Sequence, residues 1–593
     1  MRRTILGLAC LLLAITGPVG VACPQAEISW LAVPASKAFS AAVAPDALRY
    51  ACADSQESLA AFFLSESLPF SEQLVTKQKD RFCHLHYEPT IRGFRAHTES
   101  DPVRGLVFAV DWRGFQGQRS LRVGDSLDIA KAVLNRITRP LEVSLRSNPG
   151  LSSVWRQRAL DFHFPATPHN IELRENPAER ENVWAQDYLK SGDLMGNPVV
   201  LITRNSYEGK AMYGPLYSPL LSSFESRGWI RSKLSWDGGD LQFGQDPKDP
   251  SKTILFYGDA ARPYWAKTLS PKEYEWVLLR EFGADRAVDL SGLAAHIDYF
   301  VAFLPDGKTA LVSRRVRQNM AMSRAAIQLL QERFGPVPVL KELSEIYEAS
   351  PSIEGATKDR VLRLLERMRN ESSDWQPYVD AEFFRKIEAY WAKHCAEDSS
   401  ACTSGPGFVR MLETEPELLK DWLGAATVVR MGAFLPRSML ALLYSQIEET
   451  GQHRARRVDA KIRELQELGF HIIEVPQFHG DVEAKVPWSG ISYVNSTIVD
   501  DTIFIPAFGL GEAEEAIFNR LQAQLPSPYR LVPVIAQEVL LVNGGTHCVA
   551  GFLRSSRSSG ITQSSVPGQL SVDPALTVPR DERPQGTTLL RRD

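Results

Sequence analysis

The stretch Leu541-Val542-Asn543-Gly544-Gly545-Thr546-His547-Cys548-Val549-Ala550-Gly551 predicts a strand that ends in a glycine turn and places a cysteine at the mouth of a site. A largely apolar run over residues 532–542 leads into the two glycines, whose backbone freedom permits a sharp turn. Cys548 is therefore a candidate nucleophile. The competing interpretation is a small buried residue, which is the commoner state of a lone cysteine. The choice between them depends on whether the chain also supplies a base and carboxylates.

The composition is that of a soluble globular protein. The chain has 593 residues, which is enough for about two to four domains. The formal net charge is −4, and acidic and basic residues are mixed along the chain without a basic block. Nucleic acid is therefore not expected as a partner. No segment after the N-terminus is apolar for long enough to span a membrane, so no transmembrane segment is predicted in the mature chain.

The N-terminus has the form of a secretory signal. Arg2 and Arg3 precede an apolar run over residues 5–15, which is too short to span a bilayer. Small residues at 20–22 offer a cleavage site before Cys23. The predicted location is therefore secreted, that is periplasmic or extracellular. A lipid anchor on Cys23 is the less favoured alternative, because Gly20 is a poor match to the apolar residue usual in lipoprotein signals.

Export makes disulfides an expectation. Of seven cysteines, Cys10 would leave with the signal. Cys52 with Cys83 and Cys395 with Cys402 are candidate pairs, although spacing alone does not fix the pairing. Cys548 would then be free together with Cys23. No spacing typical of a zinc site is present. On a strand His84 and His86 would share a face that could bind a metal, but a solvated face is the favoured interpretation.

The pattern of apolar residues divides the chain into segments of different character. Strand and helix patterns alternate in two separate parts, strand signals nearly vanish between them, and the C-terminal end has too few large apolar residues to fold. Helices are expected over residues 47–63, 127–137 and 339–349, and a strand over 105–110. A capping box at Ser270 and Glu273 is expected to open a helix that ends at Gly283, and Asp306-Gly307 is expected to form a hairpin turn. The predicted segments are a signal peptide (1–22), an N-terminal accessory region (23–150), the first part of an α/β catalytic domain (151–315), a helical insertion (316–468), the second part of that domain (469–555) and a disordered tail (556–593).

Three further stretches carry polar side chains that suit a catalytic site. Residues 184–187 read Trp-Ala-Gln-Asp, and residues 236–241 place two aspartates around a Gly-Gly turn. Residues 295–300 are expected to open a strand. The alternation of side chains along a strand would put His296 and Asp298 on one face.

Five motifs in this order resemble the guanidine-modifying, or pentein, superfamily. The closest resemblance is to the catalytic domain of protein-arginine deiminases, and agmatine deiminases come second. The resemblance covers roughly residues 180–315 and 470–555. Each motif alone is weak evidence for the family, whereas the five in this order are specific. The motifs are Trp-x-x-Asp (184–187), Asp-Gly-Gly-Asp (237–240), His-x-Asp (296–298), Tyr-x-Asn-Ser (493–496) with Pro-x-Phe-Gly (506–509), and Gly-Gly-x-His-Cys (544–548).

The resemblance implies a fold and a set of roles. The implied fold is an α/β-propeller of five strand–strand–helix–strand repeats with the site at its centre. Cys548 would attack the guanidinium carbon, and His296 would act as general acid and then as general base. Asp187 and Asp298 would each bind a pair of guanidinium N–H groups. Trp184, Asp240 and Arg204 are further candidates for substrate binding, Arg204 as a contact to a peptide backbone.

Each motif also has a structural interpretation. His296 could be a hydrogen-bonded strand histidine with Asp298 as its neighbour, and Asp187 could cap a turn. The Gly-Gly turn at 238–239 is expected to shape the site without taking part in the chemistry. His547, placed on a strand, would point away from Cys548 and is expected to be structural. The joint occurrence of all the motifs favours catalysis.

Two departures from the protein-arginine deiminase pattern bear on the substrate and on calcium. Tyr188 stands where those enzymes usually carry Glu, which puts recognition of the substrate backbone in doubt but leaves the guanidinium chemistry intact. The acidic clusters that bind calcium in the animal enzymes are not recognisable in this chain. No cofactor is therefore expected for the chemistry, and calcium dependence is left open.

The expected function is a secreted hydrolase that converts arginine residues of proteins or peptides to citrulline and ammonia through a thiouronium on Cys548. One alternative is a deiminase of a small guanidine such as agmatine or free arginine. A second is an amidinotransferase, and a third is a non-catalytic pentein whose insertion binds a partner. The intact set of Cys548, His296, Asp187 and Asp298 argues against the last alternative. The sequence does not determine the oligomeric state.

Overall fold

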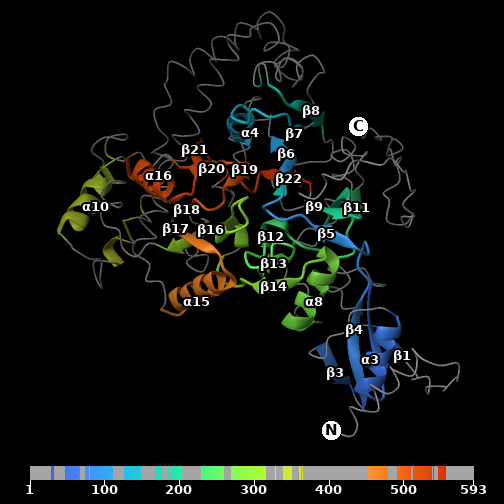
Figure 1. Cartoon of the computed structure of the whole chain (residues 1–593). Coiled ribbons are helices and arrows are strands. Elements are labelled where there is room, and N and C mark those ends of the chain that lie inside the picture. Colours follow the sequence, from blue (N-terminus) through green and yellow to red (C-terminus); the bar gives the residue numbers. More distant parts are fainter. Residues whose placement is uncertain are drawn as a thin grey trace, which may run out of the picture.

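A computed structural model shows the arrangement of the elements (Figure 1). The structure describes residues 29–32, 47–66, 74–78, 80–110, 126–147, 164, 167–175, 185–186, 189–203, 229–259, 269–294, 296–315, 327–328, 331, 338–349, 359–361, 363–364, 367, 452–478, 491–508, 512–536, 539 and 545–555. The predicted signal peptide, the Cys395–Cys402 pair, the predicted tail and most of the helical insertion lie outside these residues. No helix in this part of the chain is long and apolar enough to cross a membrane.

Five sheets are built on one plan, in which an antiparallel pair of strands is followed by a third strand parallel to the second. The first sheet contains β9 (Leu189–Leu194), β10 (Asn197–Ile202) and β11 (Trp229–Arg231), with β5 (Phe94–Ala96) beside β9. The second contains β12 (Leu241–Gln245), β13 (Thr253–Tyr257) and β14 (Arg286–Asp289). The third contains β15 (Val301–Phe303), β16 (Thr309–Arg315), β17 (His471–Phe478) and β18 (Ile491–Ser492). The fourth contains β19 (Thr497–Val499), β20 (Thr502–Ala507) and β21 (Arg530–Ile535), and the fifth β22 (Ala550–Arg554), β6 (Val103–Val110), β7 (Glu142–Ser147) and β8 (Asn170–Glu175).

Helices make the parallel connections in four of the sheets, because two parallel neighbours cannot be joined by a tight turn. In chain order these helices are α4 (Ser126–Leu134), α8 (Pro271–Phe282), α15 (Gln452–Leu468) and α16 (Glu512–Gln524). Figure 1 shows α8, α15 and α16 toward the outside, with β9, β12 and β22 nearer the middle. Since β22 from the C-terminal end pairs with β6 from the N-terminal part, the ring is closed by the two ends of the domain. This is the α/β-propeller of the pentein fold, as predicted.

Two predicted domain boundaries are corrected by the sheets. Strands β6 and β7 lie in the fifth sheet, so the propeller begins well before residue 151 and the accessory region ends before residue 150. Helix α15 connects β16 to β17 and buries Ile462 and Leu465 in the propeller core, so it is not part of the insertion. Each error has its own cause. The partner strand of β6 is far away in sequence, and a crossover helix has the same apolar spacing as an insertion helix.

Several local predictions are confirmed. The side chains of Ser270 and Glu273 form a reciprocal capping box at the start of α8, and Gly283 ends that helix with a left-handed backbone. Asp306 accepts the amides of the two residues after Gly307, which turns β15 into β16. Another predicted helix is described as α10 (Pro338–Ala349). The strand at 105–110 and the helix at 127–137 correspond to β6 and α4.

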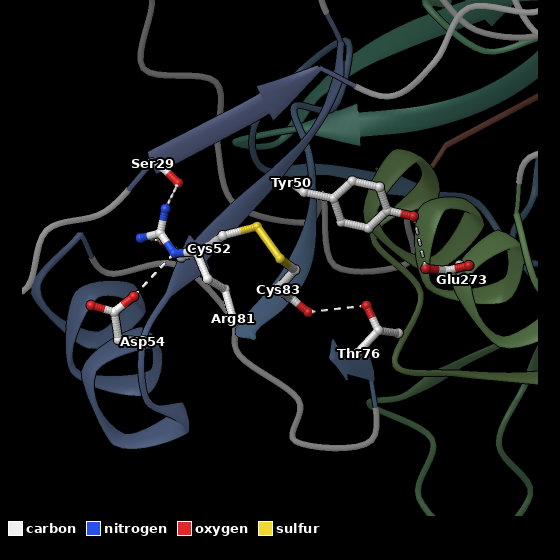
Figure 2. Close-up of a disulfide and its surroundings, with 8 residues drawn as sticks. All are labelled: Ser29, Tyr50, Cys52, Asp54, Thr76, Arg81, Cys83 and Glu273. Carbon is white, nitrogen blue, oxygen red and sulfur yellow. Dashed lines mark hydrogen bonds and ion pairs between the residues drawn. A yellow bond between two sulfur atoms is a disulfide. The ribbon is translucent and has the colours of Figure 1, made fainter. Parts of the chain in front are cut away.

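A small N-terminal unit has a sheet of its own, in the order β1-β2-β4-β3, and one helix. Its elements are β1 (Ser29–Ala32), β2 (Leu48–Ala53), α3 (Gln56–Ser65), β3 (Val75–Gln78) and β4 (Arg81–Tyr87). Cys52 and Cys83 are opposite each other in the β2–β4 pair and form the predicted disulfide (Figure 2). The helix expected over 47–63 is wrong in its first part, because residues 48–53 are a strand that pairs on both sides.

The N-terminal unit is docked on α8 through buried polar contacts. Tyr50 donates to Glu273 at 3.2 Å, as Figure 2 shows, and Glu281 of the same helix accepts from Tyr87 at 2.9 Å. His84 and His86 are buried, so the solvated face expected for them is wrong. The imidazole of His84 lies against the ring of Trp276 in α8. These two histidines therefore face the helix across the interface.

Candidate active site

Cys548 lies in a turn immediately before β22 and is buried. Its Sγ accepts a hydrogen bond from Asn495 Nδ2 at 3.2 Å, and its backbone N–H donates to Oδ1 of the same amide at 3.3 Å. A Cβ at position 545 would stand 2.5 Å from Asn495 Oδ1, so only glycine permits this approach. The second glycine of the motif thus lets Asn495 hold the sulfur from one side.

The second contact of Cys548 is with the carboxylate of Asp298. Sγ lies 3.5 Å from Asp298 Oδ2, and the same oxygen lies 3.0 Å from His547 Nδ1. The other oxygen, Oδ1, is buried without a hydrogen-bond partner among the described residues, in a side chain that is 1% exposed. A buried carboxylate oxygen with no donor is costly, because it has lost its water and gained nothing in return. The arrangement is therefore suited to a ligand that brings N–H donors.

The local structure corrects two predictions. Residues 297–299 form a short 3₁₀ helix, η7 (Ile297–Tyr299), and not a strand. His296 and Asp298 therefore do not share a face by strand alternation. Residues 546–549 form a turn, in which the amide of Ala550 donates to the carbonyl of His547. His547 consequently turns toward Asp298 and shares a partner with Cys548, contrary to the prediction that it points away.

His296 is paired with a different carboxylate. Its Nε2 lies 3.3 Å from Oδ2 of Asp237, and the imidazole is 20% exposed while Asp237 is 3% exposed. The other oxygen of Asp237 accepts the amide of Gly239 at 3.0 Å and caps η6 (Gly238–Asp240). Asp237 thus caps the Gly-Gly turn with one oxygen and orients the partly exposed imidazole of His296 with the other. Such a pair is the usual support of an acid–base imidazole.

Asp240 lies against the backbone at Gly258. A Cβ at position 258 would meet Asp240 Oδ1 at 1.9 Å, and the amide of Gly258 donates to the Asp240 carbonyl at 3.1 Å. Burial, together with Asp240 and Asp237, raises the pKa of Tyr274. Asp240 therefore belongs to the packed wall beside η6, and its expected contact with substrate stays a prediction.

Trp184, Asp187, Tyr188 and Arg204 lie outside the described residues. Two neighbours in the first motif are described, Ala185 and Gln186, and both are buried. The amide of Gln186 donates to the carbonyl of Cys548 at 3.2 Å. The Trp-x-x-Asp segment is thereby attached to the cysteine turn. The roles predicted for Asp187, Trp184 and Arg204 remain predictions.

Three residues at the site were not assigned roles from the sequence. The sequence predicts no role for Asn495 beyond its place in a motif, a turn for Asp237 and a structural position for His547. The signal that could have identified Asn495 is the Tyr-x-Asn-Ser motif itself, since an amide can hold both a sulfur and a backbone N–H. Among the described residues, no group of three or more His, Cys, Asp or Glu side chains is placed to hold a metal ion.

A comparison with protein-family models finds a match over part of the chain. The family model for Porphyromonas-type peptidyl-arginine deiminase matches residues 434–551, which include Asn495 and Cys548. This match confirms the resemblance to guanidine-modifying enzymes that the motifs predicted. A search of curated proteins found no match.

Similar solved structures include several deiminases. Agmatine deiminase of C. jejuni is 12% identical with a TM-score of 0.44, over 78% of this chain and 97% of that one. A Porphyromonas gingivalis protein assigned as an arginine deiminase is 13% identical with a TM-score of 0.43, over 78% and 100%. Agmatine deiminase of Enterococcus faecalis is 11% identical with a TM-score of 0.41, over 78% and 96%. At these values none of the three decides the substrate of this chain.

Proposed function

We propose that the protein is a deiminase that hydrolyses the guanidinium group of arginine residues in proteins or peptides, releasing ammonia and leaving citrulline. One observation carries the proposal: the buried Asp298 carboxylate contacts Cys548 Sγ through Oδ2, and no donor to its Oδ1 is present in the part of the chain that the structure describes. A planar cation with paired N–H groups would supply that donor and place its central carbon beside the sulfur. No other common biological group combines this charge with this shape.

The chemistry follows from the groups present. The thiolate of Cys548 attacks the guanidinium carbon and forms a C–S bond. His296 protonates the departing nitrogen, the C–N bond breaks, and ammonia leaves a thiouronium cation on the sulfur. His296 then removes a proton from water, and the resulting hydroxide attacks the same carbon. The C–S bond breaks and the hydroxyl proton of the intermediate passes to solvent, which gives the ureido product and the thiolate. Asp237 keeps the imidazole oriented through both steps.

Activation of the nucleophile depends on the substrate. In the free enzyme the Asp298 carboxylate lies 3.5 Å from Sγ and disfavours a second negative charge there. A bound guanidinium cancels the carboxylate charge, and the Asn495 amide donates to the sulfur at 3.2 Å. Thiolate formation is thus coupled to binding, which restricts the reaction to cationic substrates.

Two observations support a protein or peptide substrate and an exported enzyme. The matching family model describes a peptidyl-arginine deiminase. The N-terminus has the form of a secretory signal, and the Cys52–Cys83 disulfide suits an oxidising compartment. Tyr188 in place of the usual Glu favours the second candidate, a deiminase of a small guanidine such as agmatine or free arginine.

The test compares three substrates under one set of conditions. The chain without residues 1–22 is incubated with a blocked arginine peptide, agmatine and free arginine, with and without calcium, and ureido product and ammonia are measured. The proposal predicts equal amounts of both products from the peptide. The Cys548→Ala variant is expected to form neither product, and a circular dichroism spectrum controls for its fold.

The other outcomes separate the alternatives. Ureido product from agmatine or arginine alone would move the function to small-guanidine metabolism. Transfer of the amidino group to an added amine, without ureido product, would indicate an amidinotransferase. Absence of reaction with all three guanidines, in a protein shown to be folded, would overturn the proposed activity.

A further inference from the structure

A cavity lies beside Asp298 and His547, near the centre of the ring. It is small, with room for about one water-sized molecule, and its walls come from β12, β15, β19 and β22, the inner strands of four different sheets, together with η7 and the cysteine turn. We call it the central cavity. Asp298 and His547 line it, whereas Cys548 is not among the described residues that do. Asp298 therefore lies between the sulfur and this space.

Two residues that line the central cavity each carry a buried oxygen with no hydrogen-bond partner among the described residues. One of these oxygens is Asp298 Oδ1, and the other is Oε1 of Gln242, a side chain in β12 that is 2% exposed. The amide nitrogen of Gln242 donates to the Val301 carbonyl at 2.8 Å, which fixes the orientation that leaves Oε1 as an acceptor. Two such acceptors on one cavity call for an occupant that donates hydrogen bonds.

The charges on the walls favour a cation over a neutral donor. Arg554 forms an ion pair with Glu99, and its guanidinium also donates to the carbonyls of Glu99 and Asp101 at 2.9 and 2.8 Å. That pair is neutral overall. The carboxylate of Asp298 remains, hydrogen-bonded to His547 through Oδ2. The ring of Phe552, which also lines the cavity, is stacked on His547 and has the Arg554 guanidinium over it. A carboxylate oxygen and an amide oxygen that both lack donors in the described part of the chain suit a small monovalent cation.

We propose that the central cavity binds the ammonium ion produced by the reaction, between Asp298 Oδ1 and Gln242 Oε1. This inference rests on the proposed deiminase function. Ammonia is released while the rest of the substrate is still bonded to Cys548 and fills the side from which it approached. The nitrogen held by Asp298 leaves from the side of that carboxylate, takes a proton from solvent, and is received as ammonium by two acceptors already in place.

The first test does not depend on activity. Crystals of the full chain without residues 1–22 are soaked in rubidium chloride, because Rb⁺ has the size of ammonium and is located by anomalous scattering. The proposal predicts a Rb⁺ peak in contact with Asp298 Oδ1 and Gln242 Oε1, and loss of that peak in Gln242→Met. Gln477→Met, a buried glutamine of β17 that does not line the cavity, is the matched control and keeps the peak.

The second test uses product inhibition at constant ionic strength. Ammonium chloride is expected to inhibit deimination more than sodium chloride does, and Gln242→Met is expected to weaken that inhibition about tenfold, as loss of one hydrogen bond to a cation implies. A water molecule and no Rb⁺ at the two oxygens would overturn the inference while deimination stands. Rb⁺ in the cavity of a protein that deiminates nothing would keep the cation site and remove its link to the reaction.

Discussion

Nδ1 of His547 lies 3.0 Å from Oδ2 of Asp298, the same oxygen that Cys548 Sγ contacts at 3.5 Å. A histidine next to the nucleophile in sequence is thus joined to it through a shared carboxylate. The ring of His547 is held in place by stacking on Phe552. His547 therefore positions Asp298 and leaves Oδ1 as the oxygen that can receive a ligand.

Replacement of His547 is expected to weaken catalysis through Asp298. In His547→Ala the carboxylate loses its donor, and kcat/KM for the arginine peptide should fall about 10- to 100-fold, the effect of one or two charge-assisted hydrogen bonds. His547→Asn keeps a donor near the position of Nδ1 and should recover part of the loss. A merely structural role predicts equal losses in both variants, so steady-state kinetics of the pair decides the matter.

The pairing of Asp237 with His296 gives a second prediction. Asp237→Asn keeps an oxygen for the Gly239 amide but removes the charge that orients the imidazole. We expect kcat to fall about 10- to 100-fold with little change in KM, because the side chain holds the acid–base group and not the substrate. Asp237→Ala loses the cap as well and should also lower the free energy of unfolding by about 1 kcal/mol. An unchanged kcat in Asp237→Asn would refute the orienting role.

Asn495 is expected to stabilise the thiolate. Asn495→Asp replaces the Nδ2 donor, 3.2 Å from Sγ, with a second carboxylate oxygen. The rate at which iodoacetamide alkylates Cys548 at neutral pH should then fall at least tenfold, because two negative groups oppose ionisation of the thiol. Alkylation is followed by mass spectrometry of the peptide that contains Cys548. A rate equal to that of the unmodified protein would contradict this role.

The interface between the N-terminal unit and α8 should be sensitive to acid. Burial is the main reason why the pKa of His84 falls from 6.5 to about 4, and burial also lowers the pKa of His86. The unfolded chain therefore binds protons that the folded chain does not, so stability is complete above pH 6.5 and is lost as the pH falls toward 4. The shift at His84 corresponds to about 3 kcal/mol.

Chemical denaturation at a series of pH values measures this effect. The free energy of unfolding should decrease between pH 6.5 and pH 4, and His84→Leu should have a shallower slope in that window. His84 lies against the rings of both Phe63 and Trp276, whereas His86 lies near that of Phe63. An identical slope in the variant would assign the acid sensitivity to other groups.

Much of the fold could be predicted from the sequence, for reasons that particular residues illustrate. The capping box at Ser270 and the turn at Asp306 depend on local contacts, and both are confirmed. The closure of the ring by β22 and β6 joins strands more than four hundred residues apart in the chain, and no local pattern reveals it. For this reason the predicted accessory region extends too far toward the C-terminus.

The site likewise combines features that the sequence predicts with features that it does not. The motif order predicted that Cys548 and Asp298 would meet, and they do. The prediction of strands at η7 and at the cysteine turn is wrong, because the residue pattern of a short polar strand differs little from that of a turn. That error hid the pairing of His296 with Asp237 and of His547 with Asp298. Both pairings depend on a change in side-chain direction that periodicity cannot show.

The most direct test of the central claim is to stop the reaction with acid during turnover of the arginine peptide and to measure the mass of the enzyme fragment that contains Cys548. The account predicts a covalent adduct on Cys548 that carries the substrate without one nitrogen, and no ureido product from Cys548→Ala. Release of ureido product by Cys548→Ala at the rate of the unmodified enzyme, or turnover without any adduct on Cys548, would contradict it.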